Sequence, residues 1–151
     1  MAVSTEQKIA LIKMQPCFKE LNDKETRILA ELLEEEHFPA GSTIVTQGDR
    51  VDSIYIIVQG EVDVQHISYK DDLIERKSIA TLGQNEAIGL SETGFYSISG
   101  IRTATVIAIT NLVLLRLSVT LFRGFALAHS HASDVMRKFA ESMPVIPEDN
   151  F

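Results

Sequence analysis

The chain has 151 residues, of which 45% are hydrophobic and 23% charged, and these values are ordinary for one globular domain with one core. Its net charge of -7 and its pI near 5.0 argue against a nucleic-acid surface, because phosphate contacts need clustered Lys and Arg side chains. The single cysteine, Cys17, excludes an intramolecular disulfide framework, and its apolar surroundings predict a buried, unreactive thiol.

The sequence offers no segment suited to a membrane. Its first residues carry no basic region ahead of an apolar core. The longest apolar runs, Ile54–Val58 and Leu112–Leu115, fall far short of the roughly 20 residues that a membrane-spanning helix needs. We therefore expect a soluble protein in a cytoplasmic, reducing compartment, with no membrane or nucleic-acid partner.

Helical periodicity extends from Ser4 to Glu36. Asn22 is followed three residues later by Glu25, which predicts a helix N-cap with a capping-box partner. One face of the predicted amphipathic helix is formed by Ile28, Leu29, Leu32 and Leu33. The acidic run Glu34–Glu36 is interpreted as a solvated face of this helical region, ending before Pro39.

The pattern changes to short β-rich runs over residues 41–118. These predicted runs are Thr43–Thr46, Ile54–Gln65, Leu73–Leu82, Arg102–Ile109 and Leu112–Leu117. Glycines such as Gly48, Gly60 and Gly83 separate them as turns. Apolar and polar residues alternate along Glu61–Gln65, as in a strand with one buried and one wet face. Many short strands at this spacing favour a β-sandwich or a barrel.

The last part of the chain is helical again, and we expect one helix over about residues 119–143 that ends before Pro144. Its heptad-like stripe consists of Phe122, Phe125, His129, Ala132, Met136, Phe139 and Met143. The stripe has two possible partners: the domain's own barrel and N-terminal helices, or the same helix of a second copy in a homodimer.

Metal and catalytic sites are not expected. The four histidines share no metal-ligand spacing with cysteine or carboxylate side chains. On one continuous helix His129 and His131, two residues apart, cannot face the same ligand. The sequence also lacks a phosphate-binding glycine loop and a serine nucleophile elbow. We therefore predict a protein that is not an enzyme, with no catalytic residue, metal site or cofactor.

The segment Ile44–Gly60 reads as a strand, a Gly48-Asp49 turn, a second buried strand and a further bend. It resembles, nearly residue for residue, the first motif of cyclic nucleotide-binding domains, in which Gln-Gly-Asp precedes an apolar quartet and a glycine. Val51 departs from this motif, since the family usually has a small residue there.

A second motif follows at Ile88–Thr93 and Arg102–Ala108. The family pattern is apolar-Gly-Glu-x-small-apolar, a variable stretch, and then Arg-small-Ala-x-apolar-x-small. Arg102–Ala108 resembles its second half throughout, whereas the first half keeps only Ile88 and Gly89. Leu90 stands where the family has the Glu that accepts a ribose hydroxyl.

The resemblance assigns the candidate ligand-binding residues, which are Gly89, Leu90, Ser91, Glu92, Arg102, Thr103 and Ala104. Arg102 is expected to bind the nucleotide phosphate, because its planar fork meets two phosphate oxygens at once. Backbone N–H groups at the start of a short helix after Gly89 are expected to add donors. Thr103 is placed to reach the base, and Glu92 is the remaining candidate for the ribose hydroxyl.

The resemblance covers almost the whole chain and implies its fold. That fold is mainly β with flanking α: an antiparallel double-stranded β-helix, a jelly-roll barrel of the cupin-like kind, with N-terminal helices and a C-terminal helix. We expect one domain over residues 1–151, with the barrel at about 41–118 and no helix-turn-helix domain after it.

Two hypotheses for function remain open. In the first, the chain is a regulatory module that senses cAMP or cGMP in the barrel and signals to an unknown protein effector through its C-terminal helix. In the second, it is a degenerate member that binds no nucleotide and serves as a scaffold for protein interactions. The discriminating segment is Leu90–Ile101, where Leu90 either fills the ligand position or leaves it open.

Overall fold

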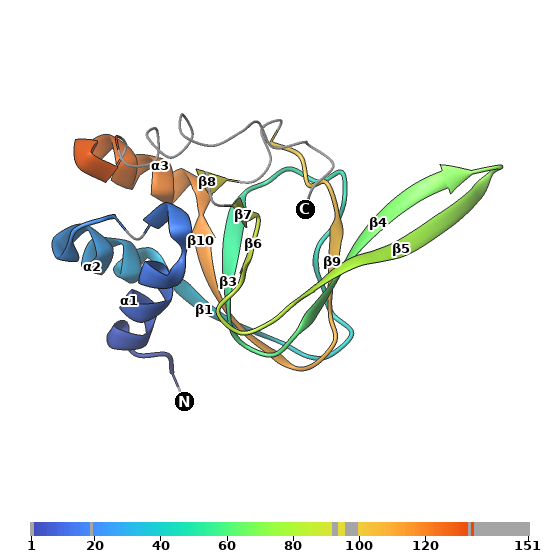
Figure 1. Ribbon diagram of the computed structural model, residues 1–151, viewed down its shortest axis with the longest axis horizontal. Helices are drawn as coiled ribbons and strands as arrows, with labels where there is room; N and C mark the ends of the chain where they lie inside the picture. Colours follow the sequence, from blue (N-terminus) through green and yellow to red (C-terminus); the bar gives the residue numbers. More distant parts are fainter. Residues whose placement is uncertain (1, 19, 92–93, 96–99, 133, 135–151) are drawn as a thin grey trace.

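The computed structural model describes residues 2–18, 20–91, 94–95, 100–132 and 134, and Figure 1 shows its β-barrel with helices gathered on one side. The first sheet has the strand order β1 (Glu34–Phe38), β10 (Leu112–Ser118), β3 (Ser53–Gln59) and β6 (Ala87–Ile88). The second sheet has the order β2 (Thr43–Val45), β9 (Thr105–Ala108), β4 (Val62–Lys70) and β5 (Leu73–Leu82). All of these pairings are antiparallel, which confirms the predicted jelly-roll barrel.

The central strands of the first sheet, β3 and β10, are buried on both faces. Successive residues of a strand point to opposite sides, so Ile54 and Ile56 of β3 pack toward the helices. Tyr55 and Ile57 point the other way, into the barrel interior. Strand β10 divides in the same manner, with Leu115 and Leu117 among the residues on the helix side. Burial on both faces explains why these strands read as continuous apolar runs rather than as alternating ones.

The second sheet has one buried face. Val62 and Val64 of β4 are fully buried in the barrel interior, whereas Asp63 between them is half-buried. Beyond the barrel, β4 and β5 continue as a long hairpin that projects away from the helices (Figure 1). Its two-residue turn consists of Asp71 and Asp72, both with positive φ, as the turns that match strand twist require.

The helices form a second hydrophobic cluster against the outer face of the first sheet. They are α1 (Thr5–Met14), the 3-10 turn η1 (Pro16–Phe18), α2 (Asp23–Leu32) and α3 (Val119–Ala128). The rings of Phe18 and Phe122 lie 5.8 Å apart, and those of Phe122 and Phe125 lie 6.0 Å apart. Cys17 is buried in this cluster, and burial raises the pKa of its thiol to about 12. None of the helices in the described ranges is long and apolar enough to cross a membrane.

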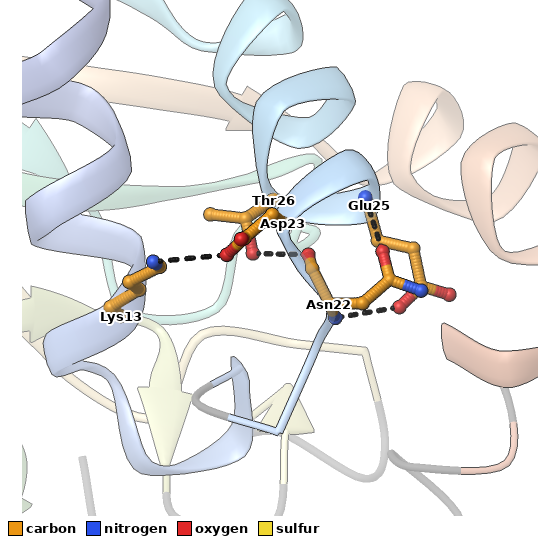
Figure 2. Close-up of polar contacts among 5 residues, drawn as sticks. All are labelled: Lys13, Asn22, Asp23, Glu25 and Thr26. Atoms are coloured by element: carbon orange, nitrogen blue, oxygen red, sulfur yellow. Dashed lines mark hydrogen bonds and ion pairs between the residues drawn. The ribbon is translucent and has the colours of Figure 1, made fainter.

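Helix α2 begins with the capping box that the sequence predicts (Figure 2). The Asn22 side-chain oxygen accepts a hydrogen bond from the Glu25 N–H at 2.8 Å, and the Glu25 carboxylate accepts one from the Asn22 N–H at 2.9 Å. Thr26 donates its hydroxyl to the Asn22 carbonyl, and Lys13 of α1 pairs with Asp23 at 3.3 Å. Two otherwise unpaired donors of the first turn are thereby satisfied.

The interpretation of Glu34–Glu36 as part of a helical region is wrong. Helix α2 ends at Leu32, and residues 34–38 form β1, paired antiparallel with β10. Glu34 lies opposite Arg116, so opposite charges face each other across the strands. Glutamate is disfavoured in strands, and here the pairing with β10 outweighs that intrinsic tendency. The barrel sheet therefore starts at Glu34 and not near residue 41.

The C-terminal helix also differs from the prediction. Helix α3 ends at Ala128, and His129 leaves the helical region with φ -129 and ψ 88 before helical residues resume at Ser130. Phe122, Phe125 and Ala132 of the predicted stripe are buried against the chain's own helices. The other stripe positions, Met136, Phe139 and Met143, lie outside the described residues.

Candidate functional site

The two sequence motifs meet through their backbones. The Arg102 N–H donates to the Asp49 carbonyl at 2.7 Å, and the Gly48 N–H donates to the Arg102 carbonyl at 2.9 Å. The Val51 N–H donates to the Gly100 carbonyl at 2.7 Å in the same ladder. Arg102 thus lies in the loop before β9 (Thr105–Ala108). The sequence predicts that this strand begins at Arg102, three residues earlier than it does.

Gln47 of the first motif has a structural role. Its side-chain amide donates to the Ile67 carbonyl at 3.0 Å and accepts from the Ile67 N–H at 2.8 Å. Its own N–H donates to the Thr105 hydroxyl at 3.0 Å. The Gln47 side chain therefore binds β4 beside the loop that carries Arg102. This double contact needs both a donor and an acceptor, and an amide side chain supplies both.

The Arg102 side chain is buried at the end of the first sheet where β3 begins and β6 ends. It is 7% exposed, and its Nη2 donates to the Ser53 carbonyl at 2.6 Å. Gly89 has a φ of +83, and a Cβ at this position would lie 2.8 Å from Nη1 of Arg102. Gly89 is thus required both by its backbone conformation and by the close approach of the guanidinium.

The electrostatic surroundings of Arg102 suit a bound anion. Burial lowers the pKa of its guanidinium, while Tyr55, Asp52 and Asp49 oppose this effect. Within the described part of the chain, its ion-pair contact is with Asp52 at 3.9 Å, and that carboxylate is 75% exposed. A buried cation is stabilised by a closely paired negative charge, and this carboxylate meets that need only at long range.

Asp52 connects the Arg102 side chain to helix α3. Its carboxylate lies 3.9 Å from Arg102 and 3.9 Å from Arg116 of β10. Its backbone carbonyl accepts a hydrogen bond at 2.9 Å from the N–H of Val119, the first residue of α3. Asp52 is not among the residues that the motifs predict for the site, although its acidic side chain stands directly before the buried strand of the first motif.

The remaining predicted site residues divide into three groups. Thr103 is half-buried beside Arg102, and Ala104 is buried among the interior residues of the barrel. Leu90 and Ser91 form the short strand β7 (Leu90–Ser91). Glu92 lies outside the described residues.

The described residues that follow Gly89, which are 90–91 and 94–95, form strands and not the expected short helix. Strand β7 pairs instead with β8 (Gly94–Phe95), with Leu90 opposite Phe95 and Ser91 opposite Gly94. A glycine and an aromatic residue disfavour a helix here, and the aromatic one suits a strand. The described residues after Gly89 therefore supply no helix N-terminus to the predicted site, and Arg102 is the charged member of that site within the described ranges.

No metal site accompanies these residues within the described ranges, where His, Cys, Asp and Glu side chains form no group of three able to hold an ion. His129 and His131 do not lie on one continuous helix as expected, because α3 ends at Ala128 and His129 leaves the helical conformation. His131 lies 2.7 Å from the Glu25 carboxylate, and His129 acts on the same carboxylate through its charge.

Comparison with known proteins places these motifs in a family context. The chain is 36% identical over 78 residues to a cGMP-dependent protein kinase, isozyme 2, of Drosophila melanogaster, across 52% of this chain and 8% of the kinase. It is 26% identical over 106 residues to the cAMP-dependent protein kinase regulatory subunit of Eremothecium gossypii, across 59% of this chain and 23% of that subunit. The chain thus spans less than a quarter of the length of these curated relatives.

Solved structures show the same fold. The N-terminal domain of a Streptomyces coelicolor transcriptional regulator matches with a TM-score of 0.73 and 23% identity over 87% of both chains. The regulatory subunit of a cAMP-independent protein kinase A from Trypanosoma brucei matches with a TM-score of 0.66 and 25% identity, over 97% of this chain and 49% of that one.

The family assignment follows from the extent of the match. The family model for the cyclic nucleotide-binding domain matches residues 35–129, which include both motifs, helix α3 and the barrel strands of both sheets apart from Glu34, the first residue of β1. The chain belongs to the cyclic nucleotide-binding domain family.

Proposed function

We propose that this chain is a regulatory module that binds a cyclic nucleotide, cAMP or cGMP, with the phosphate paired to Arg102. The observation that carries the proposal is the guanidinium itself. It is 7% exposed, lies against Gly89, and meets its described carboxylate partner only at 3.9 Å. The similarity to cGMP- and cAMP-dependent kinase chains supports a regulatory role.

The binding step exchanges one partner of Arg102 for another. In the structure Nη2 donates to the Ser53 carbonyl, a neutral acceptor. A phosphate offers two charged oxygens to the planar fork, and such charge-assisted pairs are roughly twice as strong as neutral hydrogen bonds. The bound phosphate would also lessen the attraction between Arg102 and Asp52, leaving the Asp52 carboxylate to Arg116.

The proposed output passes through Asp52 to the C-terminal helix. The Asp52 carbonyl accepts a hydrogen bond from the first N–H of α3. A shift of Asp52 would therefore weaken or move the attachment of this helix end to the barrel. The helix in turn covers the cluster formed by α1 and α2. An effector protein that recognises α3 would then respond to nucleotide, and the proposed module acts as a non-enzymatic sensor in the cytoplasm.

The scaffold alternative keeps specific support. Leu90 occupies the position of the family's ribose-binding Glu, and β7 replaces the expected helix. The Trypanosoma brucei relative is described as the regulatory subunit of a cAMP-independent kinase, and a triple mutant of that subunit is described as bound to cAMP. A protein of this fold is thus described as regulating a kinase that does not depend on cAMP, and the alternative extends this independence to every cyclic nucleotide.

Calorimetric titration with cAMP and with cGMP tests the proposal. We expect the parent to bind at least one of them with micromolar affinity at best, because Leu90 offers no ribose acceptor. Arg102→Ala should weaken binding by about 30- to 4000-fold, the equivalent of losing a buried charge pair of roughly 2–5 kcal/mol. Arg102→Lys should also weaken it, since an ammonium group cannot form the planar fork.

Arg27→Ala is the matched control, because Arg27 is exposed on α2, outside the barrel. It should bind as the parent does. Equal affinity of Arg102→Ala and the parent would remove the phosphate assignment. A folded parent that gives no binding heat with either nucleotide at millimolar concentration would favour the scaffold.

A further inference from the structure

Glu25 is a buried carboxylate that serves two parts of the chain. Its side chain is 5% exposed, and its Oε1 accepts the Asn22 N–H at 2.9 Å to complete the capping box of α2. The same oxygen lies 2.7 Å from Nδ1 of His131, which is 106 residues away in the sequence. The capping hydrogen bond is local to the start of α2, whereas the contact with His131 joins two distant parts of the chain.

The break at His129 brings the segment after α3, which is residues 129–132 and 134 of the described chain, to this carboxylate. The His129 N–H still donates to the Phe125 carbonyl at 3.0 Å, and the imidazole packs on the Phe125 ring at 5.0 Å. The chain then turns, the Ala132 N–H donates to the His129 carbonyl at 3.0 Å, and Ala132 is 1% exposed. A single histidine thus separates α3 from a helical turn that packs on α2.

The charges around Glu25 favour its ionised form. Burial raises its pKa, but the hydrogen bonds from Asn22 and His131 and the charges of His131 and His129 outweigh burial and leave the pKa below its usual range. Among the described residues that follow α3, the titratable groups are His129, His131 and Asp134. On α2 itself, Asp23 and Lys24 flank the site, and Lys13 of α1 pairs with Asp23.

We propose that Glu25 and His131 form a pH-sensitive clasp that holds the segment after α3 against the N-terminus of α2. Histidine is the side chain whose charge ordinarily changes between pH 5 and 8. With the imidazolium and the carboxylate both charged, the contact is a charge-assisted hydrogen bond, and it weakens when the imidazole becomes neutral. Raising the pH through this range weakens the clasp and favours its release, whether or not a nucleotide binds elsewhere.

Release uncovers apolar surface at the junction of the helices. Ala132 and Phe125 belong to the cluster formed by the N-terminal helices and α3, and the clasp lies at its edge. When the segment lifts away, part of this cluster becomes accessible to solvent or to a partner. The clasp therefore links solution pH to the availability of the C-terminal helical region, the same region through which the proposed module would signal.

Hydrogen–deuterium exchange of the intact chain tests the clasp at pH 6 and pH 8.5. Glu25→Gln removes the charge yet keeps the capping box, because Gln is also accepted at that position. We expect amides of residues 129–132 to exchange about three- to tenfold faster in Glu25→Gln and in His131→Gln than in the parent at pH 6. At pH 8.5 both ratios should fall toward one, because the parent clasp is already weakened.

His37→Gln is the matched control, since His37 lies 2.6 Å from Glu35 on β1 and makes the other His–Glu pair of the described chain. It should leave exchange at residues 129–132 unchanged at both pH values. The double variant Glu25→Gln with His131→Gln should exchange no faster than either single variant. Parent-like protection in His131→Gln, or an equal ratio at pH 6 and pH 8.5, would overturn the proposal.

Discussion

At the residue scale, the candidate site depends on a glycine as much as on an arginine. Gly89 has a φ of +83, and any Cβ there would meet Nη1 of Arg102 at 2.8 Å and Cγ2 of Ile54 at 3.3 Å. Gly48 has a similar φ of +94 but no atom within 4 Å of the position of a Cβ. Substituting each glycine in turn therefore distinguishes the cost of the backbone conformation alone from the added cost of steric contact with Arg102.

We expect Gly48→Ala to lower the free energy of unfolding by about 1–2 kcal/mol, the usual penalty for a Cβ in the left-handed region. Gly89→Ala should lower it further, because the new methyl group also displaces a buried guanidinium that cannot easily find another acceptor. Urea denaturation of both variants measures the difference. Equal losses in the two variants would show that Arg102 moves aside freely and is not held by its surroundings.

At the element scale, the N-terminus of α2 joins local capping to long-range contact. Asn22 and Glu25 satisfy each other's backbone donors, as their spacing in the sequence predicts (Figure 2). The burial of Glu25 and its contact with His131 arise from packing of the distant C-terminal segment. One side chain thus contributes to stability through two interactions with different pH dependence.

The free energy of unfolding at acid pH tests the contribution of the charge on Glu25. Its folded-state pKa lies below its usual value, so its ionisation stabilises the fold above the unfolded pKa of about 4.3. This contribution is lost as the pH falls through the folded pKa. We therefore expect Glu25→Gln to be less stable than the parent at pH 6 and to approach the parent's stability at pH 3, as measured by urea denaturation.

Asn22→Ala provides the comparison, because it removes the neutral half of the capping box. It should cost about 1 kcal/mol at pH 6, the typical value for a lost N-cap, and a similar amount at pH 3. If the deficit of Glu25→Gln were as large at pH 3 as at pH 6, the carboxylate charge would not be the source of its stabilisation.

At the scale of the whole molecule, two apolar clusters share one sheet. The barrel interior lies on one face of the first sheet, and the helices cover the other. Helix α3 directs Phe122 and Phe125 toward the helical cluster, while Leu121 and Leu127 are exposed, Leu127 at 87%. The first residues of the predicted stripe are thus packed against the chain's own helices. A homodimer along α3 would have to use the exposed side of the helix.

We retain the homodimer as a prediction and place it on this exposed side of α3. The parent should scatter light as a dimer, and Leu127→Glu should scatter as a folded monomer, because a charge replaces an exposed apolar contact. Phe125→Glu should instead unfold the domain, since it places a charge at a site that is 5% exposed. A parent that stays monomeric at high concentration would leave α3 as a cover for its own domain only.

The sequence by itself determined the properties that local pattern and chemistry encode. Runs of strand-forming residues with glycine turns favoured a β-sandwich or a barrel, and the resemblance to cyclic nucleotide-binding domains implied the barrel. The spacing of Asn22 and Glu25 predicted the start of α2. The motif around Gly89 and Arg102 predicted two residues that do lie together in the structure. Their roles in binding a ligand stay a prediction, because two residues can lie close together in the fold without binding a ligand.

Only the tertiary structure decided the features that depend on distant partners. Glu34–Glu36 became a strand because β10 offered an unpaired edge, a contact that lies almost eighty residues away. Asp52 entered the site because the loop before β3 meets Arg102, Arg116 and the start of α3. His131 reached Glu25 because the helix breaks at His129. Periodicity reports the face a residue occupies on its own element, whereas the partner on that face is set by chain folding in three dimensions.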